Sequence, residues 1–167
     1  MKANGGQVLV PPTDIPTVGR FAAVTDPQGA AFCLFRTAQS DPADTPSTEG
    51  GFHWNELWAK DAGAVLPFYQ AVLGYEVEEM GMPNGTYHVL KKDGAARGGV
   101  MTSPDANIPA MWLPYIHVAD CDATIERAKS RGADLKAPAV DVPGVGRFGI
   151  FLDPTGAAIG VITPDRS

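Results

Sequence analysis

The chain has few cysteines, and their arrangement does not point to a disulfide framework or a metal site. It contains two in 167 residues, Cys33 and Cys121, which lie far apart and form no CxxC pattern. Such a pair is expected to stay reduced and to fill small core positions, as in a cytoplasmic protein. We therefore expect a cytoplasmic location.

Basic residues and long apolar runs are also scarce. The chain has 13 Lys and Arg residues against 19 Asp and Glu residues, a net charge of -6. This balance repels phosphate backbones, so we do not expect nucleic acid as a partner. The first residues lack the apolar segment of a signal peptide, and no run reaches the roughly 18 apolar residues that a membrane span requires. We therefore expect no association with a membrane.

What the chain does contain is an internal repeat. Residues 5–34 resemble residues 132–161, each residue of the first copy standing 127 positions before its counterpart. Val-Gly-Arg-Phe occurs at 18–21 and at 145–148, and an Asp-Pro-x-Gly turn occurs at 26–29 and at 153–156. Repetition at a fixed spacing indicates one supersecondary unit used more than once, each copy needing a neighbour to bury its apolar face.

Two complete copies of a β-α-β-β-β module are predicted, at 53–103 and 112–163. In the first, a strand at 54–59 leads to a helix capped by Asp61 and ended by Gly74. Pro67 fits this helix only if the helix starts late enough to place it in the first turn. Three strands follow.

The second module repeats this order. A strand at 113–118 leads to a helix capped by Asp120 or Asp122 that runs to Gly132. Three further strands end at Ile162. Both modules belong to one predicted domain, 52–164.

Residues 1–37 contain only the last three strands of a further module, at 7–10, 20–24 and 30–35. The polar, proline-bearing stretch 38–51 is predicted to be a linker. Three strands without a helix leave an apolar face and unpaired edges, which the same chain or another chain must cover. We therefore expect a homodimer in which this segment packs on a complete module or on its symmetry mate.

Alternation along the opening strands separates two sets of side chains. The apolar set is expected to face the helices: Leu57, Ala59, Ile116 and Val118. The other set is expected to line a small-molecule pocket, together with Met101: Trp54, Glu56, Trp58, Leu113, Tyr115 and His117. Aromatic walls with a few polar groups are typical of such pockets.

Glu56 and His117 are the candidate catalytic residues. Glu56 lies between two tryptophans, where burial would make it a proton acceptor or a hydrogen-bonding anchor, unless it is a partly solvated carboxylate at a pocket mouth. His117 is either an acid, base or ligand contact, or a hydrogen-bonded structural residue. Trp54 and Trp58 either stack on a planar ligand or belong to the core.

Three further residues are not favoured as catalytic residues. His53 precedes the first opening strand and is expected at the surface. Arg20 and Arg147 occur in the repeated Gly-Arg-Phe, so a role in fixing that turn is favoured over catalysis.

These motifs resemble the vicinal oxygen chelate superfamily, which includes glyoxalase I, bleomycin-resistance proteins and extradiol dioxygenases. The resemblance is carried by Asp61 with the run Phe68 to Tyr75, by the run Tyr115 to Asp120, and by Gly146-Arg147-Phe148 with the turn at 153–156. Trp54-Asn55-Glu56-Leu57 is similar to the Trp-x-Glu-Leu opening of its tandem glyoxalase-like subgroup. Members of that subgroup usually have four modules, so the chain resembles one without the first module and half of the second.

The resemblance implies an α+β fold in which paired βαβββ modules form a curled mixed sheet around a shared cavity. It implies a small-molecule-binding protein or a metal-independent enzyme, with the ligand held between the two complete modules. A metal-dependent lyase or dioxygenase of the same fold and a non-catalytic oligomerising module are the alternatives. The substrate is not identified, because a fold carries many chemistries.

The expected absence of a metal cofactor also follows from the resemblance. In metal-dependent relatives each module contributes ligands at positions that here hold Trp54, Leu113 and Gly160, with Cys33 in the partial copy. Tryptophan, leucine and glycine offer no ligand atom, whereas a metal site needs several converging donors. Only Glu56 and His117 remain as donors on the predicted face.

Overall fold

The computed structural model describes residues 1–40, 43–82 and 85–165. Residues 41–42 of the expected linker lie outside these ranges. The elements follow in the order η1 (Lys2–Asn4), β1 (Gln7–Ile15), β2 (Gly19–Thr25), β3 (Ala31–Thr37), β4 (Phe52–Ala59), α1 (Ala62–Leu73), β5 (Glu76–Met82), β6 (Gly85–Lys92), β7 (Ala95–Thr102), β8 (Met111–His117), α2 (Cys121–Lys129), β9 (Asp134–Val142), β10 (Gly146–Leu152) and β11 (Ala158–Pro164).

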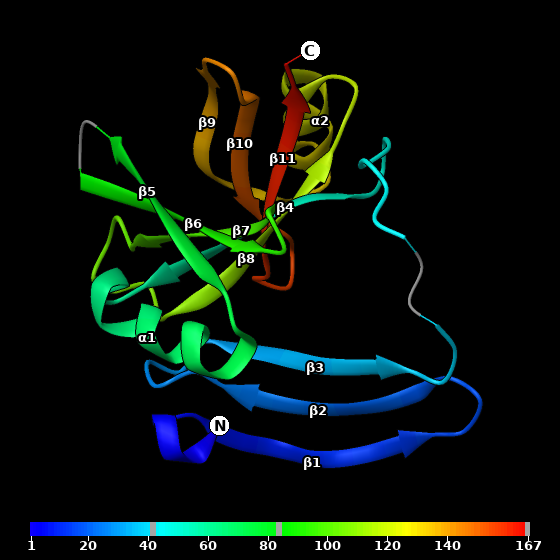
Figure 1. The fold of residues 1–167 in the computed structure, drawn as a ribbon. Helices are drawn as coiled ribbons and strands as arrows, with labels where there is room; N and C mark the ends of the chain where they lie inside the picture. The colour runs from blue at the N-terminus through cyan, green and yellow to red at the C-terminus, as the bar shows by residue number, and fades with distance from the viewer. Residues whose placement is uncertain (41–42, 83–84, 166–167) are drawn as a thin grey trace. The chain divides into compact units, whose positions relative to one another are not determined.

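The strands hydrogen-bond into a three-stranded sheet, β1-β2-β3, and an eight-stranded sheet, β5-β6-β7-β4-β8-β11-β10-β9 (Figure 1). The pairs β4–β7 and β8–β11 are parallel, whereas the hairpin neighbours are antiparallel. The predicted mixed α+β architecture is therefore confirmed. The chain divides into two compact units, the first comprising Met1–Asp44 and Glu56–Trp112, the second Thr45–Asn55 and Leu113–Ser167.

Helix α1 organises the core of the first unit. Asp61 caps it by accepting a hydrogen bond from the Ala64 amide at 2.9 Å, and Gly74 ends it with φ of 68°. Both ends are as predicted. One face of the helix is buried against β4, where Leu57 and Ala59 are fully buried. Burying an aliphatic side chain contributes about 1.5–3 kcal/mol, so this face accounts for much of the stability of the unit.

Pro67 does not lie in the first helical turn, contrary to the prediction. The helix begins at Ala62, directly after its cap, and Pro67 is interior. Without an N–H it leaves the Gly63 carbonyl without the usual intrahelical donor. Gly63 and Pro67 are both exposed, so water can reach that carbonyl, which explains how the helix accommodates a proline there.

The three N-terminal strands pack on α1 of the same chain. The Phe32 ring lies 6.4 Å from the ring of Phe68 and 5.8 Å from that of Tyr69. The Asp26 carboxylate, 2% exposed, accepts a hydrogen bond from the Tyr69 hydroxyl at 3.0 Å. That hydroxyl in turn accepts from the Trp112 indole N–H at 3.1 Å. Figure 1 shows the β2–β3 turn beside this helix.

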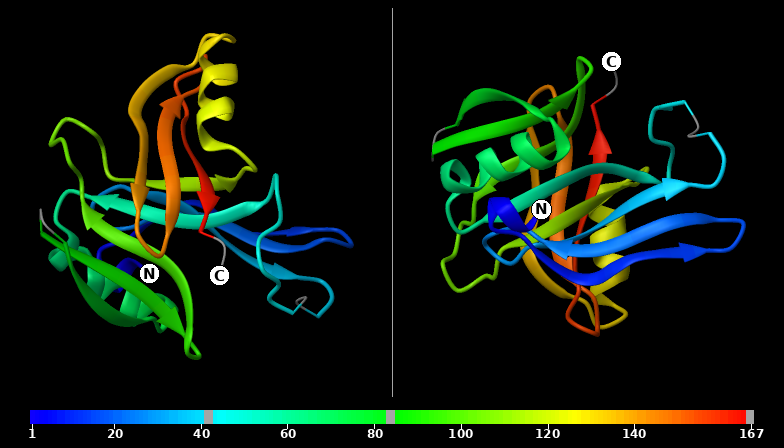
Figure 2. Two further views of the ribbon diagram at one scale, coloured as in Figure 1. Left: turned by 90° about the horizontal axis from the view of Figure 1, so that it is seen from above. Right: turned by 60° about the horizontal axis from the view of Figure 1, so that its bottom comes forward.

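In the second unit α2 covers one face of β9, β10 and β11 (Figure 2). Asp120, one of the two predicted caps, accepts a hydrogen bond from the Ala123 amide at 2.9 Å. The helix ends at Lys129, before the predicted Gly132, because the chain turns there and the Ala133 amide bonds back to the Ala128 carbonyl. Burial raises the pKa of the Cys121 thiol to about 11, as expected for a small core residue. Cys33 on β3 is exposed, contrary to the expectation that both cysteines fill core positions.

Among the residues that the structure describes, no helix combines the length and the apolar character needed to cross a lipid bilayer. The cytoplasmic location predicted from the cysteines remains a prediction.

Candidate functional site

Strand β4 presents Glu56 on the face opposite the helix. Leu57 and Ala59 point to α1 and are fully buried. Because successive side chains of a strand alternate, Glu56 and Trp58 lie on the other face. Glu56 is 8% exposed, so the carboxylate is nearly removed from solvent, one of the two environments that the sequence analysis left open.

Two neutral donors hold the Glu56 carboxylate. Its Oε1 accepts a hydrogen bond from the Trp58 indole N–H at 2.7 Å, and its Oε2 accepts one from the Tyr87 hydroxyl at 2.8 Å. A buried carboxylate is tolerated only with such partners, because an unpaired one would cost several kcal/mol. The arrangement fixes the orientation of the carboxylate, which can then accept a hydrogen bond or a proton from a ligand.

Tyr87 was not predicted, although the sequence contains a signal for it. It lies on β6, and β7 stands between β6 and β4. The residue of β7 paired with Glu56 is Gly99, where a Cβ atom would lie 1.8 Å from the Tyr87 hydroxyl oxygen. Glycine at 99 therefore leaves the space through which Tyr87 reaches Glu56. A glycine pair inside a strand, Gly98-Gly99, indicates such a close approach.

Met101 and Trp58 are neighbours in the first unit. They pair in parallel between β7 and β4, so the predicted contribution of Met101 to the face of Glu56 and Trp58 agrees with the register. Trp54 is half-buried and belongs to the part of β4 in the second unit. The first unit thus brings together Glu56, Trp58, Met101 and the unpredicted Tyr87.

Leu113 and Tyr115 are buried in the second unit, at 0% and 5% exposure. The Tyr115 ring packs edge-on against Phe148 with centroids 5.7 Å apart. Tyr115 pairs in parallel with Gly160 of β11. A Cβ atom at Gly160 would lie 2.4 Å from the Tyr115 ring. Tyr115 therefore fills a space that the glycine leaves.

His117 lies in a cluster with Ser47 and His53. The Nδ1 atoms of His53 and His117 lie 2.6 Å and 3.3 Å from the Ser47 hydroxyl oxygen, and the rings are 5.8 Å apart. Burial, and then the neighbouring His117, lower the pKa of His53. His53 is half-buried and lies within β4, whereas the sequence placed it before the strand and at the surface. Residues just before β4 bond to β8 through Gly50, Gly51 and His117, which covers this end of the strand.

A pocket of about 460 Å³ opens beside this cluster in the second unit. His117 lines it together with Glu49, Asp120, Thr124 and Arg127. The acidic side chains offer hydrogen-bond acceptors, and Arg127 offers hydrogen-bond donors.

The residues that the structure describes contain no cluster of three or more His, Cys, Asp or Glu side chains suited to a metal ion. The parallel pairings also place Gly99 opposite Glu56 and Gly160 opposite Tyr115. Glycine has no side-chain ligand atom, whereas a structural or catalytic zinc needs at least three protein donors. The donor set around these strands therefore does not fit the metal site expected for metal-dependent relatives.

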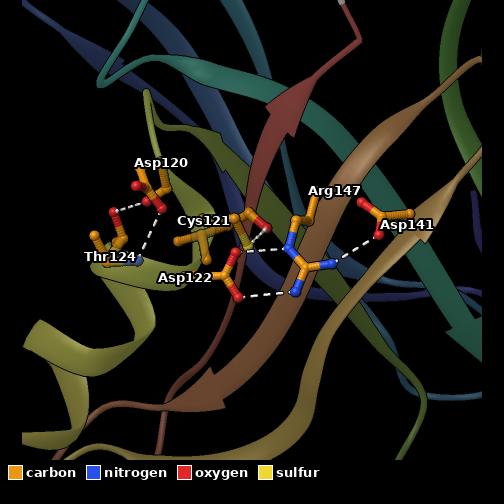
Figure 3. A network of polar contacts seen from close by, with 8 residues as sticks. Asp120, Cys121, Asp122, Thr124, Asp141 and Arg147 are labelled. Carbon is orange, nitrogen blue, oxygen red and sulfur yellow. Dashed lines mark hydrogen bonds and ion pairs between the residues drawn. The ribbon is translucent and has the colours of Figure 1, made fainter.

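Arg147 forms the largest described ion-pair network of the second unit (Figure 3). Its guanidinium donates to both Asp122 oxygens at 2.6 and 2.8 Å and to Asp141 at 2.8 Å. These contacts join the first turn of α2 to β9 and β10, and Arg147 lowers the pKa of Asp122. This arrangement agrees with the structural role predicted for Arg147.

The chain belongs to the Glyoxalase/Bleomycin resistance protein/Dioxygenase superfamily, whose family description matches residues 51–161. It is 38% identical over 162 residues to CFP32 of Mycobacterium tuberculosis, whose name suggests a glyoxylase, covering 96% of this chain and 62% of CFP32. It is 32% identical over 165 residues to the anthracycline biosynthesis protein DauV of Streptomyces sp. strain C5, covering 97% of this chain and 59% of DauV. The chain thus spans about three fifths of these relatives.

Solved structures share the fold at low sequence identity. A Mn(II)-bound glyoxalase from Novosphingobium aromaticivorans aligns with a TM-score of 0.63 at 19% identity, over 97% of this chain and 56% of that one. The 2,2',3-trihydroxybiphenyl 1,2-dioxygenase of Sphingomonas wittichii RW1 aligns with a TM-score of 0.62 at 15% identity, over 93% and 62%. At these identities the likeness concerns the fold alone.

Proposed function

We propose that the chain binds a small organic molecule on the face of the first unit opposite α1, with Glu56 as its hydrogen-bonding anchor. The observation that carries the proposal is the Glu56 carboxylate itself, 8% exposed and oriented by Trp58 and Tyr87. A desolvated, oriented carboxylate is costly for stability and is a feature of binding and catalytic sites.

The ligand class follows from the groups around Glu56. Trp58 and Tyr87 offer aromatic surface, on which a planar conjugated compound stacks, and Met101 adds an adaptable apolar contact. The carboxylate selects a ligand that carries a hydroxyl or another hydrogen-bond donor. A planar hydroxylated carbonyl compound combines both properties. The name of DauV, an anthracycline biosynthesis protein, supports this class.

As an enzyme, the chain would use Glu56 to take a proton from the bound ligand without a metal. Proton transfer to a positioned carboxylate requires hydrogen-bond distance to the reacting group. Trp58 and Tyr87 would hold the carboxylate in place during the transfer. If no proton is transferred, the chain binds the ligand at the same site without catalysis. The cavity expected between the two modules from the family resemblance stays a prediction.

The test is a thermal-shift screen with planar hydroxylated quinones, aromatic ketones and small 1,2-dicarbonyl compounds. A compound that raises Tm is titrated against the wild-type protein, Glu56→Gln and the control Glu76→Gln, which removes an exposed carboxylate of β5. We expect Glu56→Gln to weaken binding about tenfold or more, as loss of a charged hydrogen-bond acceptor should, and Glu76→Gln to leave it unchanged. Equal affinity of all three proteins would remove Glu56 from the site.

His117 is kept as a candidate acid or base for the pocket of the second unit. The same titrations with His117→Asn decide this. Unchanged affinity and turnover would leave His117 the structural role that its contacts with Ser47 already give it.

A further inference from the structure

We propose that the ligand site extends from Glu56 across the sheet face to Met80 on β5. Its ligand is then an elongated planar compound of several fused rings, with a hydroxyl on one terminal ring. This inference rests on the proposed function and deepens it, because it sets the length of the ligand and its direction on the sheet. It also adds Met80 as the contact for the far end of the ligand.

A row of four side chains crosses β4, β7, β6 and β5. Trp58 and Met101 pair between β4 and β7, and Tyr87 and Met80 pair between β6 and β5. The antiparallel register of β6 and β7 sets Tyr87 opposite Met101. Because paired residues of a sheet point to the same face, the row lies on the face of Glu56 and Trp58, opposite α1.

The far end of this row is open to a ligand. The other three members are half-buried, whereas Met80 is 50% exposed and Met82, next on the same face of β5, is 48% exposed. On the opposite face of β5, Val77 packs against the core beneath α1. Neighbouring exposed apolar side chains mark an interaction site, and a thioether adapts to partners of different shape.

Tyr87 provides a flat surface between the two ends of the row. A Cβ atom at Gly99 would lie 1.8 Å from the Tyr87 hydroxyl oxygen and 2.3 Å from its Cζ. The ring therefore reaches sideways over β7 toward Glu56 instead of standing away from the sheet. It forms a low aromatic surface between Glu56 and the methionines, on which a planar compound can lie flat.

An ion pair limits the width of the site beside Met80. Glu78 lies two positions before Met80 on β5 and therefore on the same face. Its carboxylate accepts a hydrogen bond from the Lys91 ammonium of β6 at 2.7 Å. A ligand broad in both directions would cover these charges and remove their hydration, which is unfavourable. A long, narrow ligand follows the apolar row and leaves the pair in solvent.

Strand spacing sets the length of the ligand. The order β5-β6-β7-β4 places three interstrand intervals between Met80 and Trp58, and each interval measures about 4.8 Å, so the row is about 14 Å long. A single aromatic ring covers only a fraction of that distance. A compound held by Glu56 at one end therefore reaches Met80 only if it carries several fused rings.

The experiment compares hydroxylated aryl ketones and quinones of increasing length. The series is hydroxyacetophenone, hydroxyacetonaphthone, hydroxyanthraquinone and hydroxynaphthacenequinone, each with its hydroxyl on a terminal ring. Dissociation constants are measured for the wild-type protein, Met80→Gln, Glu56→Gln and the control Glu79→Gln. Glu79 adjoins Met80 on the other face of β5, and its side chain is 72% exposed. The changes at 79 and 80 thus introduce the same side chain on opposite faces of one strand.

We expect the affinity of the wild-type protein to rise with ring number. Met80→Gln should weaken binding of the two longest compounds about tenfold, because it removes apolar contact surface at the far end, and should leave hydroxyacetophenone unaffected. Glu56→Gln should weaken binding of every compound, and Glu79→Gln of none.

Two results would overturn this inference alone: an affinity independent of ring number, or equal affinity of Met80→Gln and the wild-type protein for hydroxynaphthacenequinone. The proposed function would still stand if Glu56→Gln weakened binding throughout. Unchanged affinity in Glu56→Gln would instead overturn the proposed function, and this inference with it.

Two further outcomes also count against the inference. If none of the four compounds binds, the elongated ligand is excluded, while the small dicarbonyl compounds of the thermal-shift screen still test the proposed function. If light scattering shows a dimer that Met80→Gln converts to a monomer, a second copy covers Met80 and the ligand does not reach it.

Discussion

At the residue scale, Asp26 and Asp153 show how one turn is used in two environments. In both Asp-Pro-x-Gly turns the first aspartate accepts hydrogen bonds from two amides of the turn, Gln28 and Ala30 in one and Thr155 and Ala157 in the other. Asp26 is 2% exposed and accepts a further bond from the Tyr69 hydroxyl. Burial and the nearby Asp26 raise the pKa of Tyr69, so the hydroxyl keeps its proton and remains a donor.

We predict that Asp26→Ala destabilises the protein much more than Asp153→Ala. Asp26→Ala leaves a buried hydroxyl and two amides without their acceptor, which should cost about 3 kcal/mol. Asp153→Ala exposes the same kind of amides to water and should cost about 1 kcal/mol. Urea unfolding of both variants measures the difference. Equal losses would show that the bond between Asp26 and Tyr69 contributes nothing.

Glu56 shows what a strand pattern can predict at this scale. Its place on the face opposite Leu57 and Ala59 followed from alternation along residues 54–59, whereas its burial was left open. Its partner Tyr87 did not follow, because the contact crosses two strand pairings. Only the register of β6, β7 and β4 brings the hydroxyl over Gly99 to the carboxylate.

At the element scale, the ion pair of Asp122 with Arg147 ties the first turn of α2 to β10. Arg147 lowers the pKa of Asp122 below its ordinary value of 3.8. A carboxylate whose pKa is lower in the folded state stabilises that state above its unfolded pKa, and the stabilisation is lost as the pH falls through the folded pKa.

We therefore predict that Asp122→Asn lowers Tm by a few degrees near neutral pH. The difference from the wild-type protein should narrow as the pH falls below about 4, where the wild-type carboxylate gains its proton. Asp134→Asn, which removes the exposed pair with Lys136 on β9, is the control and should change Tm little at any pH. A Tm difference for Asp122→Asn that stays constant down to pH 2 would contradict the assignment.

The two helices also show where prediction of elements succeeds and fails. The N-cap of α1 at Asp61 was predictable, because an aspartate directly before an apolar period satisfies the free amides of the first turn, whereas the cap of α2 was left open between Asp120 and Asp122. The interior position of Pro67 could not be predicted, because whether a helix tolerates a proline there depends on which face of α1 is solvated. That face is known only once the helix is packed on β4 and Phe32.

At the scale of the whole molecule, we predict that the purified protein holds no stoichiometric divalent metal. The glycines opposite Glu56 and Tyr115 offer no ligands, and two donors with waters bind a metal weakly. Elemental analysis of protein purified without chelator should find less than about 0.1 equivalent of zinc, nickel, iron or manganese. Near one equivalent that disappears in Glu56→Ala would instead favour the metal-dependent lyase or dioxygenase alternative.

The homodimer expected from the sequence remains a prediction. Its premise was that three strands without a helix need cover. Phe32, Asp26 and Gln28 obtain part of that cover from Tyr69 and Asp61 of the same unit. The cover comes from the same chain, which the sequence left open as one of two possibilities. Light scattering of the purified protein reports the oligomeric state.

The sequence alone predicted the α+β class, the order of strands and helices, the cap of α1 at Asp61 and the face of β4 that carries Glu56. These features follow from local signals: a repeated turn, an aspartate before a helical period, and alternation along a strand. The tertiary structure decided which side chains meet across strands, as Tyr87 meets Glu56, and which of two like residues is buried, as Asp26 is and Asp153 is not. Those outcomes depend on pairing register and on which element packs against which, and neither is encoded within a single segment of the chain.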